Sequence, residues 1–151
     1  MMPNIRMATQ EDAFYLKQLL AQMGEIYERD IEEMENRIQS FLNLTRHQLL
    51  VAEDEEGVVG CIAFGCYEQL RLQGCCCHID TLIVDKKYHG KGIGKALIAT
   101  AEAYAKTQGA TEIELTTANH RRKHGTHNFY KAIGYQDHVD IDCTYFVKQE
   151  R

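Results

Sequence analysis

One stretch of sequence decides the expected fold, and from residue 84 to residue 97 it reads VDKKYHGKGIGKAL. It joins an apolar strand pattern to a helical pattern, and glycines recur at alternate positions, Gly90, Gly92 and Gly94. Glycines let backbone N–H groups approach a ligand closely, and the start of a helix adds unsatisfied N–H donors and a positive dipole end. Lys91 and Lys95 add positive charge to an otherwise acidic chain. The stretch therefore predicts an anion site, and a diphosphate fits its requirements.

Two other phosphate-binding motifs do not fit this stretch. A P-loop has two glycines five positions apart followed by Lys and Ser or Thr, but no glycine precedes Gly94 at that spacing and Ala96 follows Lys95. A dinucleotide-binding turn has its third glycine three positions after the second, and here Lys95 stands there. The structural alternative is a turn that only closes the corner between strand and helix. Three glycines at a helix start would cost stability for that purpose alone.

The elements next to this stretch predict a parallel pair of strands. The pattern indicates a strand over residues 75–84, a helix over 91–108 closed by Gly109, and a strand over 111–116. A strand–helix–strand crossover of this kind places the two strands parallel in the middle of a sheet.

The remainder of the chain adds helices and antiparallel strands. We expect a strand at 5–7, helices from Thr9 to Gly24 and over 28–44, and a hairpin of residues 48–53 and 58–67 around Glu56-Gly57. A helix at 122–133 and strands at 135–139 and 144–147 follow. The fold class is therefore mixed α/β, with one central sheet flanked by helices.

Chain length, net charge and cysteine content limit the number of domains, the binding partners and the cellular compartment that we expect. The 151 residues predict a single domain spanning 1–151. A net charge of −5 argues against nucleic acid or an anionic membrane as the main partner, since both are bound through Lys and Arg. The first ten residues lack signal-peptide features, and the six cysteines fit free thiols in a reducing compartment, so we expect a cytoplasmic protein. The run Cys75 to Cys77 predicts small buried strand residues.

Two motifs resemble those of the GNAT superfamily of acyl-CoA-dependent acetyltransferases. The segment His89-Gly-Lys-Gly-Ile-Gly94 is similar to motif A, which is Arg or Gln, two residues, Gly, one residue, then Gly or Ala. Here His89 stands at the first position, where the family usually has Arg or Gln. The sequences NHRR from Asn119 and FYKAIGY from Phe129 resemble motif B, with its Phe-Tyr-x-x-x-Gly-Tyr/Phe ending. The element order matches as well, so the resemblance covers nearly the whole chain.

The resemblance implies a GNAT fold whose central parallel strands splay apart to hold acetyl-CoA. The pantetheine arm would pair with main-chain groups of Leu82 and Val84, the diphosphate would lie on the amides of residues 89–95, and Asn119 would contact the pantetheine or the acetyl end. The helix near Arg122 would flank the adenine. The implied cofactor-binding residues are Leu82, Ile83, Val84, His89, Gly90, Lys91, Gly92, Ile93, Gly94, Lys95, Asn119 and Tyr130.

The same resemblance implies direct attack of an amine on the thioester. Tyr130 matches the motif B tyrosine, which in the family lies near the sulfur as general acid, although a core tyrosine is the structural alternative. Backbone N–H groups near Leu82 or Val84 are the candidate oxyanion donors. Asp80 is the candidate base or ammonium-binding group, and His78 is the alternative base. Strand alternation predicts one face for His78, Asp80, Leu82 and Val84.

A metal site is the less favoured interpretation of three histidines. His120, His124 and His127 have the spacing of one helix face, but no Cys or acidic ligand accompanies them and the family binds no metal in motif B, so we expect none. The acidic residues 25–35 cover the acceptor pocket in the family, which favours a cationic amine, and a solvated helix face is the simpler alternative.

The predicted function is that of an N-acetyltransferase acting from acetyl-CoA on a primary amine of a small molecule. Acetylation of a protein or peptide amine, and a non-catalytic acyl-CoA-binding module, are the alternatives. The sequence leaves a homodimer open.

Overall fold

The computed structural model describes residues 2–117, 125–137, 146 and 148–149. The chain divides into two compact units, Met1–Leu115 and Thr116–Arg151. The first unit holds the sheet and three of the helices. No helix in the described parts of the chain is long and apolar enough to cross a membrane.

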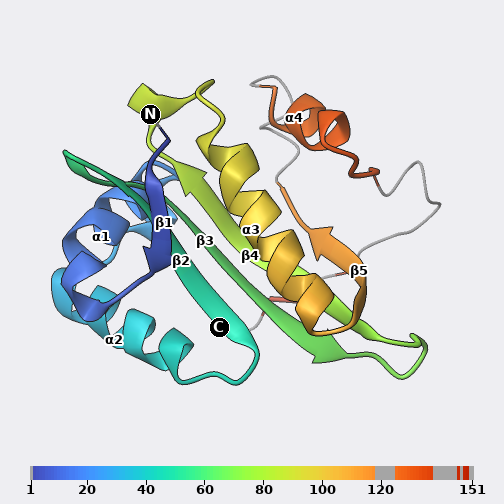
Figure 1. Cartoon of the computed structure of the whole chain (residues 1–151). Coiled ribbons are helices and arrows are strands. Elements are labelled where there is room, and N and C mark those ends of the chain that lie inside the picture. The colour runs from blue at the N-terminus through green and yellow to red at the C-terminus, as the bar shows by residue number, and fades with distance from the viewer. Residues whose placement is uncertain (1, 118–124, 138–145, 147, 150–151) are drawn as a thin grey trace. The chain divides into compact units, whose positions relative to one another are not determined.

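The sheet of the first unit has its strands in chain order, β1-β2-β3-β4-β5 (Figure 1). Neighbouring strands run antiparallel as far as β4, and β4 and β5 run parallel. This confirms the mixed sheet and its parallel pair, which lies at one end of the sheet in the described residues. The strands are β1 (Asn4–Met7), β2 (His47–Asp54), β3 (Gly57–Glu68), β4 (Cys75–Val84) and β5 (Ala110–Leu115).

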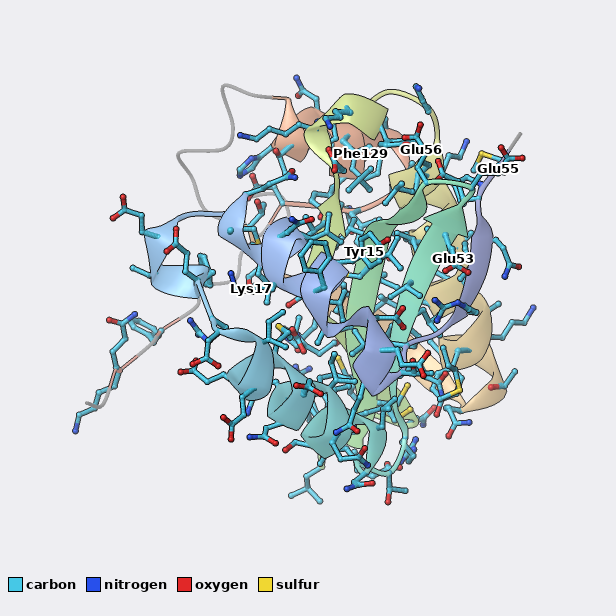
Figure 2. The ribbon with its side chains drawn as sticks, turned by 90° about the vertical axis from the view of Figure 1, so that its left-hand side faces the viewer. Tyr15, Lys17, Glu53, Glu55, Glu56 and Phe129 are labelled. Carbon is cyan, nitrogen blue, oxygen red and sulfur yellow. The ribbon has the colours of Figure 1, made fainter. Side chains whose placement is uncertain are left out.

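Helices cover both faces of this sheet. On one face, α1 (Ala13–Ala21) and α2 (Ile31–Leu42) pack over β2, β3 and the edge of β4, and Figure 2 shows Tyr15 of α1 in front of these strands. On the other face lies α3 (Ile93–Thr107), which crosses β3, β4 and β5. Short 3-10 turns, η1 (Gln10–Asp12), η2 (Glu25–Tyr27) and η3 (Lys86–Tyr88), connect the larger elements.

Each face has its own set of buried apolar side chains. Beneath α1 and α2, buried side chains of the helices meet those of the strands; this cluster includes Leu16, Leu19, Met34, Ile38, Val51, Cys61, Ala63 and Ile83. On the opposite face the ring of Phe64 packs edge-on against Tyr104 of α3, with ring centroids 5.6 Å apart. Cys75, Cys76 and Cys77 are all buried free thiols, as expected, whereas Cys143 lies outside the described residues.

Two helices begin later in the chain than expected, because the residue before the first helical turn determines where each one starts. The second helix begins at Ile31 and not near Glu28, because the Asp30 side chain accepts the backbone N–H of Glu33 at 2.8 Å and caps the first turn. The long helix begins at Ile93 and not at Lys91, because Gly92 has φ +83°, outside the helical region. The remaining expected elements of this unit lie within a few residues of the observed ones.

The second unit contains α4 (Thr126–Ala132), which starts after Gly125 with φ +81°. α4 ends one residue earlier than the helix expected at 122–133, and residues 122–124 of that expectation lie outside the described residues. The described residues 135–137 form no strand, so that part of the strand predicted at 135–139 is wrong. Residues 138–139 and most of the strand predicted at 144–147 lie outside the described residues.

An ion pair between the buried Asp12 and the half-buried Arg6 fixes the start of the first helical segment against the sheet. Asp12 is 4% exposed and accepts two hydrogen bonds from Arg6 of β1, at 2.8 and 2.9 Å, and a third from the backbone N–H of Thr9 at 2.8 Å. Arg6 also binds Glu53 of β2. Burial raises the pKa of Asp12, but the hydrogen bonds from Arg6 and Thr9 outweigh it and hold that pKa below its ordinary value.

We expect Asp12→Asn to lower the free energy of unfolding by about 2–4 kcal/mol at pH 7, because it leaves Arg6 without its buried partner. Since the pKa of Asp12 is lower in the folded state, its contribution is present above about pH 4 and is lost as pH falls through that lower pKa. Urea unfolding from pH 7 to pH 3 should therefore show a smaller pH dependence in Asp12→Asn than in the wild type. Glu11→Gln, at the exposed neighbouring position, should change neither quantity; equal pH dependence in all three proteins would contradict the assignment.

Candidate active site

The parallel strands β4 and β5 separate before β4 ends. Their pairing stops at Ile79 and Leu115, whereas β4 remains paired with β3 as far as Val84 and Gly60. The last residues of β4 thus have one edge that β5 does not cover.

The main chain of Leu82 and Val84 points toward that edge. The backbone N–H of Asp85 donates to Val59 of β3 at 2.8 Å, so the preceding carbonyl, that of Val84, points away from β3. The register from Thr81 to Val84 is regular, so Leu82, two residues earlier, has the same orientation. An extended chain of amides such as pantetheine is able to pair along such an edge as an added strand does. The predicted contact of Leu82 and Val84 with the cofactor is compatible with this geometry.

The glycine turn follows directly after this edge. Gly90 and Gly92 have φ +78° and +83°, a conformation that favours glycine. Apart from the adjoining residues, no heavy atom of the described chain lies within 4 Å of the position a Cβ would take at either glycine. Among the residues that the structure describes, no side chain caps α3, whose first internal hydrogen bond runs from Ala96 N–H to the Gly92 carbonyl at 3.0 Å. The turn is open, and the first N–H groups of a 15-residue helix are directed into it.

Side chains around the turn are held by their neighbours. The ammonium group of Lys91 lies 5.1 Å from the centre of the Tyr88 ring, and the Tyr88 hydroxyl donates to Glu56 at 3.0 Å. The hydrogen bonds to Glu56 and Asp54 raise the pKa of Tyr88 to about 12. Nε2 of His89 lies 2.8 Å from the Val84 carbonyl oxygen, so this ring contacts the open edge of β4. Its contact with a phosphate stays a prediction.

A β-bulge interrupts β4 at Asp80. Thr81 is opposite Ala63 and Ile79 is opposite Phe64, so Asp80 is an extra residue with no partner in β3. The prediction that His78, Asp80, Leu82 and Val84 share one face is therefore wrong. His78 lies on the face of Thr81 and Ile83, beneath α1 and α2, whereas Leu82 lies on the face of α3. The extra residue Asp80 interrupts the alternation of side chains between the two faces of β4, so residues before and after it no longer follow the same pattern.

The bulge lies beside two groups of polar side chains. The exposed carboxylate of Asp80 accepts a hydrogen bond from the Thr81 hydroxyl. On the preceding rung, Nδ1 of His78 lies 3.2 Å from Oε1 of Glu114 on β5, and the Tyr67 hydroxyl donates to the same oxygen. Glu114 and Tyr67 were missed from the sequence. The alternation of Glu112 and Glu114 along a predicted strand is a signal from which Glu114 could have been found, whereas no pattern in the sequence indicates Tyr67.

Three buried cysteines, Cys61, Cys76 and Cys77, offer no ready thiolate for a covalent acetyl-enzyme. Burial raises the pKa of Cys61 and Cys77 to about 12 and that of Cys76 to about 11. A thiol must lose its proton to act as a nucleophile. This chemistry is compatible with direct transfer between two bound substrates.

The second unit holds the predicted general acid. Tyr130 lies on α4, where its ring packs edge-on against Phe129 and Tyr135, with centroids 5.2 and 6.1 Å apart. Asn119 lies outside the described residues, as do His120 and His124 of the histidine group. The contacts of Tyr130 and Asn119 with a cofactor stay predictions.

The model of the Acetyltransferase (GNAT) family matches residues 13–135. The chain belongs to this GNAT family. Its match begins with α1 and includes the open edge of β4, the glycine turn and α4. GNAT acetyltransferases use acetyl-CoA as co-substrate, and the open edge and the uncapped first N–H groups of α3 suit its amide arm and its diphosphate.

Individual GNAT relatives are distant. N-acetyltransferase 8B of Homo sapiens is 30% identical over 104 residues, which are 69% of this chain and 45% of that protein. An uncharacterized N-acetyltransferase of Chlorobaculum tepidum is 27% identical over 143 residues, 95% of this chain and 77% of that protein. The chain thus spans less than half the length of the human relative. A solved structure titled as a transcriptional regulator from Bacillus halodurans C-125 has a TM-score of 0.85 at 24% identity, covering 99% of both chains, and shares the fold.

Proposed function

We propose that this protein is an N-acetyltransferase that moves the acetyl group of acetyl-CoA directly to a primary amine of a small molecule. One observation carries the proposal: the open edge of β4, with Leu82 and Val84 pointing into it, leads straight into a glycine turn with free N–H donors. A strand edge that can pair with amide groups, followed by a turn that can bind a diphosphate, suits a coenzyme A thioester.

The residues proposed to hold acetyl-CoA follow the path of this edge and turn. The main chain of Leu82 and Val84 pairs with the pantetheine amides, and the N–H groups between His89 and Lys95 hold the diphosphate. Lys91 and Lys95, both exposed, supply the positive charge that the phosphates need. Asn119 contacts the pantetheine or the acetyl end.

The catalytic roles follow from what amine acetylation requires. Acetyl-CoA supplies, when bound, a thioester carbonyl that an amine attacks. A backbone N–H of Leu82 or Val84 stabilises the oxyanion, and Tyr130 protonates the leaving thiolate. Asp80, whose carboxylate is exposed beside the bulge, binds the ammonium group of the acceptor.

The choice between a small molecule and a peptide as acceptor is open to a direct test. Release of free CoA is measured with two sets of acceptors: diamines, amino sugars and amino acids in one, and peptides with free N-termini in the other. We expect turnover with the first set. Turnover confined to peptides would favour protein acetylation, and acetyl-CoA binding without turnover on any amine would favour a non-catalytic binding module.

Asp80→Asn distinguishes the two roles open to this carboxylate. As a binding group, Asp80 makes a charge-assisted hydrogen bond, so its loss should raise the half-saturating amine concentration about tenfold or more while the saturating rate changes little. Thr81→Val keeps the carboxylate and removes only its hydrogen-bond donor, and should have a smaller effect in the same direction. A lowered saturating rate with steeper pH dependence would assign Asp80 as the base, and unchanged kinetics would remove it from the site.

A further inference from the structure

Two segments that are distant in the sequence meet beside the glycine turn. One is the tip of the β2–β3 hairpin, which carries Glu55 and Glu56 (Figure 2), and the other is η3, which ends at Tyr88 just before the turn. The Tyr88 hydroxyl donates to Oε2 of Glu56 at 3.0 Å. The ammonium nitrogen of Lys91, inside the turn, lies 5.1 Å from the centre of the Tyr88 ring. One aromatic ring thus connects the hairpin to a cation of the turn.

The Tyr88 ring is fixed from the hairpin and from its own backbone. In the hairpin, the Asp54 carboxylate accepts the backbone N–H of Glu56 at 2.8 Å. In η3, the backbone N–H of Tyr88 donates to the Asp85 carbonyl at 2.8 Å, and the Asp85 side chain accepts the N–H of Lys87 at 3.0 Å. Hydrogen bonds to Glu56 and Asp54 raise the pKa of Tyr88 to about 12, so its hydroxyl remains a donor at neutral pH. The ring is therefore held in place before any ligand binds.

Lys91 is the residue whose position this ring restricts. A free lysine side chain has many rotamers, and fixing it when a ligand binds costs conformational entropy. Contact with the face of the Tyr88 ring attracts the ammonium group and limits that freedom in advance. Lys91 is exposed, and with Tyr88 and Asp54 it lines a cavity of about 240 Å³ next to the start of α3. An anion can therefore reach the ammonium group.

We propose that Tyr88 and Glu56 are positioning residues for Lys91, whose ammonium group they hold beside the glycine turn to pair with a phosphate of acetyl-CoA. This role rests on the proposed function and extends its cofactor site to the β2–β3 hairpin. By charge alone Glu56 would oppose binding, because a carboxylate repels a nearby diphosphate. Glu56 favours binding only by acting through Tyr88 and Lys91, so its removal separates the two effects by sign.

The Kd of acetyl-CoA, measured by isothermal titration calorimetry, tests these roles. Lys91→Met should raise the Kd about tenfold, the effect of losing one charge-assisted hydrogen bond. Tyr88→Leu should raise it about two- to tenfold, because the ligand must then fix the lysine side chain itself. Tyr88→Phe keeps the ring and should raise the Kd by less. Glu56→Ala should raise it about twofold, although the change removes a negative charge.

The double variant Tyr88→Leu/Lys91→Met shows whether Tyr88 acts through Lys91. Its Kd should equal that of Lys91→Met, because the ring then has no ammonium group to position. A ring that only stabilised the turn would instead weaken binding by the same factor with and without Lys91. Glu55→Ala is the matched control for Glu56→Ala, since it removes the same charge from an exposed position at the same hairpin tip. It should leave the Kd unchanged or slightly lower.

Thermal melts without ligand show which variants are folded. If Tyr88→Leu does not fold, Tyr88→Phe alone and combined with Lys91→Met gives the same comparison. An unchanged or lower Kd in the Tyr88 or Lys91 variants, or an equal effect of the Tyr88 change with and without Lys91, would overturn the positioning role and leave the proposed function in place. A lower Kd in Glu56→Ala would overturn the role of Glu56. A wild-type protein that does not bind acetyl-CoA would overturn the proposed function as well.

Discussion

Gly92→Glu is expected to abolish the stabilisation of this protein by acetyl-CoA. Bound at a hundred times its Kd, a ligand adds about 2.7 kcal/mol to the free energy of unfolding. For a chain of this size that is a rise in Tm of roughly 5–10 °C. At Gly92 the new side chain enters the open space of the turn with a negative charge, where the diphosphate is proposed to lie. A thermal melt with millimolar acetyl-CoA should therefore show a rise in the wild type and none in the variant.

Gly109→Glu supplies the matched control for this experiment. Gly109 has φ +80°, close to the +83° of Gly92, and it also has open space where a Cβ would lie, but it follows the far end of α3. Both variants incur a similar backbone strain, so their Tm values without ligand should fall by similar amounts. The Gly109→Glu protein should keep the full rise with acetyl-CoA. Equal loss of the rise in both variants would show that strain, and not the turn, is responsible.

Tyr130→Phe is expected to lower the turnover rate by about 10²–10⁴-fold, the range typical for the loss of one general acid. The change removes a hydroxyl and keeps the ring, so the edge-on packing with Phe129 and Tyr135 is retained. The rise in Tm with acetyl-CoA should therefore stay close to that of the wild type. Single-turnover measurements of acetyl transfer separate the chemical step from product release.

Tyr135→Phe is the control for the Tyr130 variant, because it removes a second hydroxyl from the same aromatic group and motif B accepts Phe at this position. Its single-turnover rate should fall far less than that of Tyr130→Phe, because only the Tyr130 hydroxyl is proposed to protonate the thiolate. If Tyr130→Phe also keeps the wild-type single-turnover rate, Tyr130 is a packing residue and another group protonates the thiolate.

The glycine turn and the parallel strands around it were predictable because their signals are local. Glycines at alternate positions, a strand pattern before them and a helical pattern after them all lie within one continuous segment. The observed β4 has the predicted bounds, Cys75–Val84. The start of α3 was predicted two residues early because the left-handed conformation of Gly92 follows from the turn and not from helix propensity.

The bulge at Asp80 was not predictable from β4 alone. It arises from the register with β3, in which Phe64 pairs with Ile79 and Ala63 with Thr81. A strand read by itself alternates without interruption, so the sequence put His78 on the face of Leu82. The contact between His78 and Glu114 likewise depends on the register of two strands joined through α3. Contacts of this kind come from tertiary pairing, which one sequence does not encode locally.

The measurement that tests the central claim most directly is the stoichiometry of the reaction with the best amine of the panel. Free CoA is measured with a thiol reagent, and the acetylated amine is measured by mass spectrometry in the same samples. The account predicts that the protein releases free CoA and forms the acetylated amine at equal rates. Both rates should exceed those of the same mixture without the protein. Release of CoA without an N-acetylated product, or no release with any amine despite binding of acetyl-CoA, would contradict it.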